Sequence, residues 1–389
     1  ANINITAISQ GSSERNLSVV IKNIDLKKAL QAVHAGFYLS PKRLAIGLIG
    51  PGLVGKSLLE QLKNTIKSLS LKYQVDLQVL GLINSEKMLL AELPIELGSW
   101  QDEFQSKGMA ANLPKFINHF ANVANAVLID CTANQPVAKL YQHIMAKGIH
   151  VITPNKYANA DDLDYYKSLK AKNYYFYEAT VCAGLPVIST LQDLIKTGDE
   201  IIEIEAVVSG TLSYIFNEMA KGKSFSAAVL EAKNRGFTEP DPREDLSGMD
   251  VARKLVCLAR EIGHEVSLAE VLVQDLVPPE LKSCSSQEFI ANLSAYDKAM
   301  DRGLMQAKEK GNSLHYVAKI FQNGKLEIAI QSLPATHPFS RLEGTDNMLI
   351  FKTKRYNERP LIIQGPGAGA EVTAAGIFAD LLRLVNILA

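Results

Sequence analysis

Hydrophobic and polar residues follow two main patterns along the chain, which predict two different orders of strands and helices. The first pattern covers about residues 41–177. Residues 43–49 form a nearly continuous apolar run, typical of a strand that is buried on both faces of a sheet. A helix with one apolar face follows, and strands and helices then alternate. This order predicts an α/β fold with a Rossmann-type, doubly wound parallel sheet. The further elements expected here are strands at 75–83, 127–130 and 150–153 and a helix at 137–147.

The second pattern begins at about residue 178. It predicts strands and helices that do not alternate regularly along the chain. It predicts a second domain of the α+β class over residues 178–364. A last helix at 372–388 follows the pattern of the first domain again. We therefore expect residues 365–389 to pack back on the first sheet. The elements expected in the second domain are strands at 201–208, 314–321 and 325–331 and helices at 213–221, 226–234 and 250–262.

The first forty residues show a third, shorter pattern of two strands and one helix. Ile3, Ile5 and Ala7 alternate with polar residues, residues 17–21 form a second strand, and a helix starts at about Asp25. Two strands and one helix make a poor core by themselves. We therefore expect residues 1–40 to be part of a larger module.

Composition and charge exclude several classes of function. The 389 residues carry 41 basic and 41 acidic side chains, so no net charge favours nucleic acid or an anionic membrane. The four cysteines lack the CxxC spacing of a zinc site or a redox motif, which favours reduced thiols and a cytoplasmic location. No apolar run is long enough to span a bilayer. The chain begins with Ala1 rather than Met, so we expect a processed form or a fragment of a longer protein.

A glycine-rich turn lies between the first apolar strand and the helix that follows it. In this context the first glycine permits a tight turn, the second lets the backbone approach a pyrophosphate, and the third lets helix and strand pack closely. The helix N-terminus then offers free N–H groups to the phosphates. A plain βα turn is the alternative. The turn reads Gly50, Pro51, Gly52, Leu53, Val54 and Gly55.

The choice between NAD and NADP depends on the end of the second strand. An Asp or Glu there would bind the ribose 2′-hydroxyl of NAD, but this position is Asn84, and Glu86 lies two residues later. Lys87 is the nearest basic residue. We therefore expect NADP, with NAD still possible. Thr132, just after the strand at 127–130, completes the expected cofactor site of the first domain.

The densest group of charged residues lies between Gly236 and Lys254. Two prolines hold residues 239–243 in a stiff, non-helical segment. On the helix that follows, Asp250 and Lys254 are four residues apart and therefore share one face. Such a pair is usually a solvated ion pair. The rigid acidic segment beside the same face makes a functional pocket the better interpretation.

This segment closely resembles the signature of homoserine dehydrogenases, and further motifs of that family follow in the same order over about residues 41–389. The first forty residues, with Asn2–Ile5 and Gln10–Glu14, resemble the end of the regulatory ACT region of bifunctional aspartokinase–homoserine dehydrogenases. The resemblance implies interconversion of aspartate semialdehyde and homoserine, a catalytic and dimerisation role for the second domain, and an aspartokinase in the parent chain. The further motifs begin at Thr153, Glu178, Ser209, Gly365 and Val372.

The resemblance also implies roles for individual residues. Lys254 is the general acid and base, with Asp250 beside it, and Lys156 is a second lysine near nicotinamide and substrate. Glu239 and Asp245 bind the ammonium group of the substrate. Remaining positions that match the family are those of a monovalent-cation site, such as one for sodium, at Glu178, Val181, Ala183 and Leu185, and of the cofactor site at Gly236 and Gly369.

The residue types suit this chemistry. When a hydride reaches an aldehyde carbon, the oxygen becomes an alkoxide, and an ammonium such as that of Lys254 can stabilise and protonate it. The reverse reaction needs a neutral lysine, so we expect burial or Lys156 to lower the pKa of Lys254. Two positions depart from the family: Cys182 replaces a common glycine, and Phe237 replaces a common tyrosine.

Two other functions remain possible from the sequence. A dehydrogenase that oxidises aldehydes through a thiol needs a cysteine activated by histidine, and none of the cysteines lies in such a motif. A regulator without catalytic activity, suggested by the ACT-like start, would bind cofactor without turnover. The resemblance also predicts a homodimer or a higher homo-oligomer.

Overall fold

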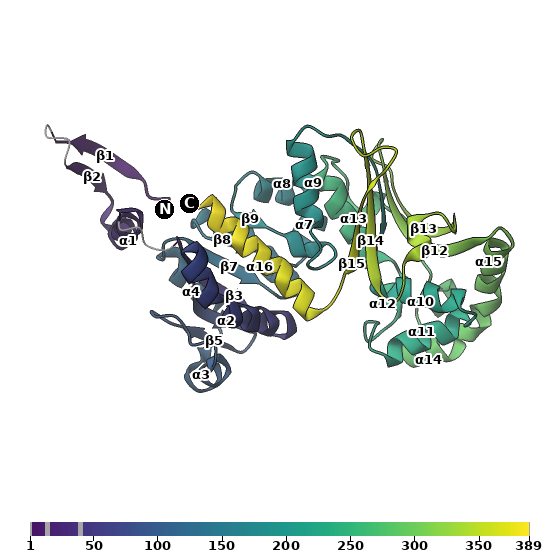
Figure 1. Ribbon diagram of the computed structural model, residues 1–389. Helices are drawn as coiled ribbons and strands as arrows, with labels where there is room; N and C mark the ends of the chain where they lie inside the picture. The colour runs from purple at the N-terminus through teal and green to yellow at the C-terminus, as the bar shows by residue number, and fades with distance from the viewer. Residues whose placement is uncertain (1, 12–15, 38–41, 389) are drawn as a thin grey trace. The chain divides into compact units, whose positions relative to one another are not determined.

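A computed structural model describes residues 2–11, 16–37 and 42–388 of the chain, which form two compact units (Figure 1). The first unit comprises Ala1–Asn155, Lys167–Tyr177 and Thr373–Ala389, and the second comprises Lys156–Tyr166 and Glu178–Val372. Residues 12–14 of the ACT-like motif and the expected boundary at 40/41 lie outside the described ranges. None of the helices in those ranges has the length and apolar character needed to cross a bilayer.

The first unit is built on a mostly parallel sheet with the strand order β6-β5-β4-β3-β7-β8-β9. The strands β3, β4, β7, β8 and β9 are parallel, and β5 and β6 add an antiparallel edge. Hydrophobic side chains bury the central strands on both faces, as expected. The bounds are β3 (Lys42–Ile49), β4 (Val75–Ile83), β5 (Lys87–Leu90), β6 (Met109–Ala110), β7 (Ala126–Asp130), β8 (His150–Ile152) and β9 (Tyr175–Phe176).

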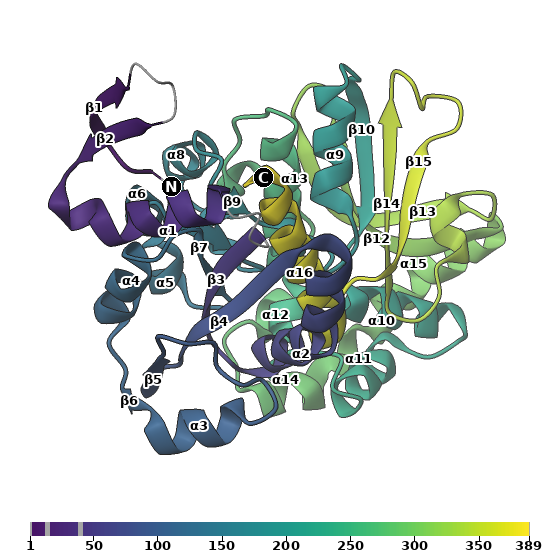
Figure 2. The same cartoon turned by 60° about the vertical axis from the view of Figure 1, so that its left-hand side comes forward.

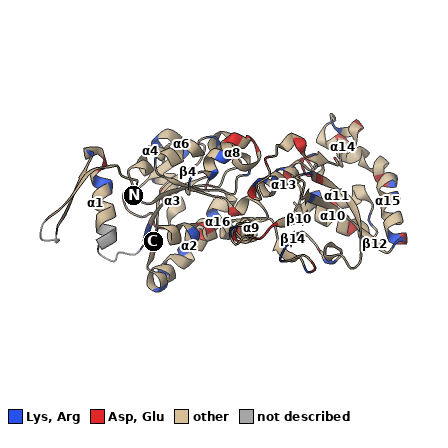
Figure 3. Ribbon diagram, turned by 90° about the horizontal axis from the view of Figure 1, so that it is seen from above, with Lys and Arg blue, Asp and Glu red and all other residues tan. Residues whose placement is uncertain are grey.

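Helices cover both faces of this sheet, which confirms the doubly wound α/β fold. Helices α2 and α16 lie on one face, and α4 and α6 on the other (Figure 1 and Figure 3). Helix α16 packs on the first unit as expected. The helices of this part of the chain are α2 (Leu53–Tyr73), α3 (Trp100–Lys107), α4 (Leu113–Ala121), α5 (Gln135–Ala138), α6 (Tyr141–Ala146), α8 (Leu163–Lys170) and α16 (Ala370–Ile387).

One predicted helix is divided. Instead of a single helix over 137–147, the chain forms α5 and α6 with a tight turn between them. The N–H of Leu140 donates to the carbonyl of Val137 at 3.0 Å, an i to i−3 bond that interrupts the α-helical pattern. The order of strands is unaffected, because both short helices lie between β7 and β8.

The N-terminal segment has the expected two strands and one helix. Strands β1 (Ile5–Gln10) and β2 (Leu17–Ile21) pair in antiparallel fashion, and η1 (Asn23–Asp25) leads into α1 (Leu26–Phe37) (Figure 2). Apolar side chains on all three elements are exposed, which agrees with the poor core expected of such a segment. They include Ile8, Leu17, Val20 and Leu30.

The second unit is built on a sheet with the order β11-β13-β12-β10-β14-β15. The pairs are antiparallel except for β11 with β13. Strand β14 was not predicted, although it pairs with β10 at the centre of the sheet. The bounds are β10 (Ile201–Val207), β11 (Leu272–Val273), β12 (Asn312–Phe321), β13 (Leu326–Pro334), β14 (Asp346–Thr353) and β15 (Leu361–Pro366).

Helices α10, α13 and α15 pack against β12 on one face of this sheet, and an apolar cluster under η6 lies on the other face. Val251, Leu255 and Leu258 form the buried apolar face of α13. The helices of the second unit are α7 (Tyr157–Ala160), η2 (Glu178–Thr180), α9 (Val187–Lys196), α10 (Gly210–Ala220), α11 (Phe225–Asn234), α12 (Arg243–Leu246), α13 (Met249–Glu261), η3 (Leu268–Glu270), η4 (Pro279–Leu281), α14 (Ser286–Asn292), η5 (Leu293–Tyr296), α15 (Asp297–Glu309) and η6 (Pro338–Arg341).

Two short segments group differently from the expected domain ranges. Residues 156–166, expected with the first domain, lie in the second unit, and so do residues 365–372. The first difference matters for function, because it places Lys156 in the same unit as α13. Basic and acidic residues are interspersed along the ribbon, in keeping with the balanced charge (Figure 3).

Candidate functional site

Two lysines and one aspartate form an ion-paired cluster at the start of α13. Asp250 and Lys254 are one helical turn apart, and their side chains are 2.9 Å apart. The other carboxylate oxygen of Asp250 accepts a hydrogen bond from Lys156 at 2.6 Å. The ammonium of Lys254 also donates to the carbonyl of Val208, at the end of β10, at 2.7 Å. Lys254 therefore has two of its three protons directed at protein oxygens.

Lys156 reaches this cluster from a segment that is remote in sequence. Helix α7, directly after Lys156, packs on α13. Arg260, near the end of α13, is buried, and its guanidinium donates to the carbonyls of Asn159 at 2.7 Å and Asp161 at 2.9 Å. This arginine therefore anchors the segment that carries Lys156, a contact that local sequence patterns do not reveal.

The protonation of Lys254 differs from the expectation. Burial, the largest single effect, lowers the pKa of Lys254. The charge of Asp250, its hydrogen bond with Lys254 and smaller effects of Cys182 and Asp245 together outweigh burial, so that this pKa is raised above its ordinary value. The expected lowering of the pKa is therefore wrong for the free protein. Burial also raises the pKa of Asp250, yet the charges of Lys254 and Lys156 outweigh it and hold the pKa below its ordinary value. The cluster thus keeps Lys254 as an ammonium and Asp250 as a carboxylate.

The acidic segment before α13 folds back on itself through Asp245. One oxygen of this carboxylate accepts the N–H of Glu239 at 2.8 Å, and the other accepts the hydroxyl of Thr211, on α10, at 2.9 Å. Burial and the charges of Asp250 and Glu244 raise the pKa of Asp245. Thr211 lies in one of the quoted family motifs, but its contact with Asp245 was not anticipated.

Glu239 shares this concentration of negative charge. Burial, followed by the charges of Asp245, Glu244 and Asp250, raises the pKa of Glu239. Burial is the largest cause of both shifts, and repulsion between the neighbouring carboxylates adds to it. An ammonium group between them would relieve that repulsion, so the electrostatics suit a cationic ligand.

A glycine that the sequence analysis did not single out forms the corner between α12 and α13. Gly248 has a φ of +71°, a left-handed conformation, and a Cβ at this position would clash with Tyr316 and Val273. The corner aligns the acidic segment with the first turn of α13. A glycine directly before a helix was the available signal.

In the first unit, the glycine-rich turn joins β3 to α2. Gly50 has a φ of +83°, and a Cβ there would lie 2.7 Å from the methyl group of Thr132. A Cβ at Gly55 would lie 2.5 Å from the carbonyl oxygen of Gly50, so the third position needs glycine for close packing. A Cβ at Gly52 would meet nothing within 4 Å. The open side of Gly52 leaves room for a bound group beside the first turn of α2, which starts at Leu53 and Val54.

Thr132 is held beside this turn by a buried aspartate. Asp130, the last residue of β7, accepts hydrogen bonds from the N–H and hydroxyl of Thr132 at 2.9 and 2.6 Å, and from the hydroxyl of Tyr141 at 2.5 Å. Strands β3 and β7 are neighbours, and the chain crosses to opposite sides of the sheet after each of them. Ligands of open α/β sheets bind at such a point.

The end of β4 forms a tight turn around Asn84. Its side-chain oxygen accepts the N–H groups of Glu86 at 2.9 Å and of Lys87 at 2.7 Å. The ammonium of Lys87 is hydrogen-bonded to Gln105, on α3, at 3.0 Å. Lys87 is thus engaged with the protein, while Asn84 is exposed.

Glu178 is buried in the second unit and caps α9. Its two carboxylate oxygens accept the N–H groups of Ile188 at 2.8 Å and Ser189 at 3.0 Å. In the loop between η2 and α9, Cys182 and Ala183 have positive φ values of 58° and 54°, which is uncommon for residues other than glycine. The remaining residues expected at the cation site are in the same loop, with Val181 buried and the carbonyl of Leu185 accepting the N–H of Val187 at 2.8 Å.

Cys182 and Phe237, the two departures from the family pattern, are both accommodated by neighbours. Asn347 is buried on β14, and its amide donates to the sulfur of Cys182 at 3.4 Å. The ring of Phe237 packs edge-on against Tyr214 with centroids 5.1 Å apart. The two glycines expected to line the cofactor site also lie in the second unit, at the end of α11 (Gly236) and directly before α16 (Gly369).

Comparison with known families gives consistent matches along the chain. The profile described as homoserine dehydrogenase matches residues 186–382, and that described as the homoserine dehydrogenase NAD binding domain matches residues 50–174. An ACT domain profile matches residues 1–37.

Individual relatives agree with these profiles. The chain is 50% identical to the chloroplastic bifunctional aspartokinase/homoserine dehydrogenase 2 of Arabidopsis thaliana, over all of this chain and 43% of that protein, so it spans less than half of that relative. It is 38% identical to the homoserine dehydrogenase of Schizosaccharomyces pombe, over 88% of this chain and 95% of that one.

A solved structure shares the fold. A hyperthermophilic archaeal homoserine dehydrogenase in complex with NADPH superimposes with a TM-score of 0.67 at 22% identity, over 89% of this chain and 98% of that one. Together with the profile and sequence matches, the site geometry leads to one assignment. The chain belongs to the homoserine dehydrogenase family of NAD(P)-dependent oxidoreductases.

Proposed function

We propose that this chain catalyses the reversible, NAD(P)H-dependent reduction of L-aspartate 4-semialdehyde to L-homoserine. The observation that carries the proposal is the ammonium of Lys254, held protonated by Asp250 in the same unit as the crowded carboxylates Glu239 and Asp245. One group donates a proton to oxygen, and the others attract an amino-acid ammonium. This combination suits a substrate that carries both an aldehyde and an amino group.

The residues of the chain have separate tasks in this reaction. The third proton of Lys254 is available for the carbonyl oxygen of the substrate, where it stabilises the developing negative charge and is then transferred. Asp250 keeps Lys254 charged, and Lys156 balances the second carboxylate oxygen of Asp250. The bound nicotinamide supplies the hydride, and the turn at Gly50–Gly55 with Thr132 would hold the cofactor.

Carboxylates at Glu239 and Asp245 orient the substrate. Each oxygen of Asp245 already accepts one hydrogen bond and retains a further lone pair for an ammonium. Charge-assisted hydrogen bonds of this kind are stronger than neutral ones. The amino group would therefore fix the position of the aldehyde relative to Lys254.

The direct test is to follow the loss of NADPH absorbance with aspartate semialdehyde, and its gain with homoserine and NADP. Turnover in both directions supports the proposal. NADPH formation from aspartate semialdehyde would instead indicate oxidation of the aldehyde through a thiol, and binding without turnover would indicate a regulator. Burial raises the pKa of Cys182 and raises that of Cys257 to about 12, which speaks against an activated thiolate at either position.

NADP is the proposed cofactor, because Asn84 offers no carboxylate to the ribose. We expect Asn84→Asp to shift the preference toward NAD by about tenfold or more, because a carboxylate accepts the 2′-hydroxyl and repels a 2′-phosphate. The substitution keeps the oxygen that accepts the N–H groups of Glu86 and Lys87, so the turn should survive. The measurement is the ratio of kcat/KM for the two cofactors. A hundredfold preference of the unaltered protein for NAD would refute the proposal.

The glycine-rich turn allows cofactor binding to be separated from folding. Gly52→Ala should weaken NADPH binding by about tenfold or more while leaving the unfolding temperature unchanged, because its Cβ enters space that is open in the free protein. Gly55→Ala should lower both the affinity for NADPH and the unfolding temperature, since its Cβ would lie 2.5 Å from the carbonyl oxygen of Gly50. Fluorescence titration and thermal unfolding give the two quantities. Gly98→Ala, whose Cβ meets only Glu96 at 3.5 Å, is the control.

Several further expectations stay predictions. They are the domain ranges 1–40, 41–177 with 365–389, and 178–364, a homodimer or higher homo-oligomer, an aspartokinase in the parent chain, and a cytoplasmic location. A monovalent cation such as sodium is also proposed. A buried carboxylate at Glu178 in a loop of main-chain carbonyls supports it, since hard cations prefer oxygen ligands.

A further inference from the structure

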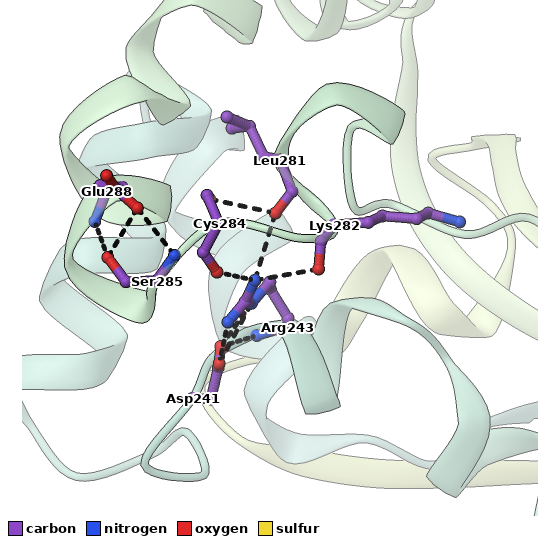
Figure 4. Close-up of polar contacts among 7 residues, drawn as sticks. All are labelled: Asp241, Arg243, Leu281, Lys282, Cys284, Ser285 and Glu288. Carbon is purple, nitrogen blue, oxygen red and sulfur yellow. Dashed lines mark hydrogen bonds and ion pairs between the residues drawn. The ribbon is translucent and has the colours of Figure 1, made fainter.

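Arg243 connects the acidic segment to a separate part of the second unit. Its guanidinium donates to Asp241 from Nε at 3.0 Å and from Nη2 at 2.5 Å. The other terminal nitrogen donates to the carbonyls of Leu281 at 3.2 Å, Lys282 at 3.1 Å and Cys284 at 2.7 Å. Figure 4 shows the guanidinium between the Asp241 carboxylate and these three carbonyls. Only a planar guanidinium, with several N–H donors in fixed directions, can donate to the Asp241 carboxylate and to the three carbonyls at the same time.

The receiving segment is itself well fixed. Ser285 and Glu288 form a capping box that starts α14, also drawn in Figure 4. Phe289, on the same helix, is fully buried, and the guanidinium of Arg243 lies over its ring at 5.6 Å. The arginine therefore fastens the acidic segment to a rigid support.

Residues 239–247 form the acidic segment, and its own hydrogen bonds, such as that from the N–H of Glu239 to Asp245, hold only part of it. Helix α12 is a single turn, too short to be stable without tertiary contacts. Leu246 anchors its C-terminal end in the core, and Asp245 follows Arg243 by two residues. At the N-terminal end of α12, the contacts of Arg243 with Asp241 and the 281–284 carbonyls add a second polar attachment to that of Asp245 with Thr211.

We propose that Arg243 is a positioning residue for the substrate ammonium site: it sets the affinity for the amino-acid substrate by holding Glu239 and Asp245 in place, without touching the substrate. This inference rests on the proposed function of that site. Loss of the contacts of Arg243 with Asp241 and with the 281–284 carbonyls, here called the Arg243 clamp, weakens binding of the substrate and of the transition state equally. The expected signature is a raised KM at nearly constant kcat.

Arg243→Lys is the main test, because lysine keeps the charge but cannot form the fork. We expect the KM for homoserine and for aspartate semialdehyde to rise about tenfold, with the KM for NADP and kcat changed less than about threefold. Asp241→Asn, which weakens the other end of the clamp, should act in the same direction. Arg302→Lys, on the exposed face of α15, is the matched control and should change none of these.

A double variant tests whether Arg243 acts through Asp245. In the background of Asp245→Asn, the further substitution Arg243→Lys should raise KM much less than it does in the unaltered protein. If the two substitutions raise KM by factors that simply multiply in the double variant, the inference is overturned. An unchanged KM in both Arg243→Lys and Asp241→Asn would also overturn it, and so would a fall in kcat with no change in KM.

Hydrogen exchange gives a readout that does not depend on activity. Backbone amides of residues 239–247 should exchange faster in Arg243→Lys than in the unaltered protein, whereas those of α13 should not. Unchanged exchange over 239–247 would overturn the inference even if activity falls. If the unaltered protein shows no turnover, the proposed function fails, and the exchange experiment still decides whether Arg243 fastens the segment.

Discussion

Replacing Lys254 by methionine is expected to lower kcat for the reduction of aspartate semialdehyde by about 10² to 10⁴-fold, the range typical of general acid–base catalysis. Methionine keeps the unbranched shape and suits the buried position, but it has no proton to give. The affinity for NADPH should change little, because the expected phosphate-binding turn lies in the other unit. Steady-state assays of NADPH absorbance measure kcat, and titration with NADPH measures the affinity for the cofactor.

The control for this substitution is Lys221→Met. Lys221 is an exposed lysine at the end of α10, and its ammonium pairs with Glu218. It should retain full activity. If Lys254→Met kept a kcat within about threefold of the unaltered protein, Lys254 could not be the proton donor.

Replacing Asp250 by asparagine should change how activity depends on pH. In the unaltered protein Lys254 has a raised pKa, because the charge and hydrogen bond of Asp250, with smaller effects of Cys182 and Asp245, together outweigh burial. A lysine is neutral only above its pKa, so kcat/KM for homoserine oxidation should rise about tenfold per pH unit through the accessible alkaline range. In Asp250→Asn burial acts without the compensating charge, and the pKa of Lys254 falls.

The variant should therefore reach its plateau of homoserine oxidation at a lower pH than the unaltered protein. Its reduction of aspartate semialdehyde, which needs the ammonium, should decline with rising pH over the same range. Both activities should also fall about tenfold or more, because Lys156 and Lys254 lose their common partner. Rate profiles between pH 6 and 10 in both directions measure this, with Glu261→Gln at the far end of α13 as the control. Coincident profiles would show that Asp250 does not govern Lys254.

Local patterns account for the parts of the fold that the sequence analysis described correctly. Buried parallel strands are apolar on both faces, and the glycine-rich turn needs its residues at positions set by the turn itself. The pairing of Asp250 with Lys254 follows from the pitch of one helix. In each case the residues that interact are close in sequence, so spacing is sufficient to predict contact.

Two features of the fold were missed. Strand β14 is held by pairing with β10, more than a hundred positions earlier in the chain. Helix α5 and helix α6 are separated by a turn that apolar spacing does not reveal. Sequence patterns describe which face of an element is apolar, but its neighbours are chosen by the rest of the fold.

What the sequence determined by itself is therefore the α/β class, the glycine-rich turn, and the ion pair and acidic segment around α13. The tertiary structure alone decided three further points: that Lys156 joins Asp250 through the Arg260 anchor, that Arg243 ties down the acidic segment, and that the pKa of Lys254 is raised. The last of these was wrong from sequence for a physical reason. A buried lysine titrates according to the difference between a large desolvation cost and a large attraction, and only the positions of the atoms set which is greater.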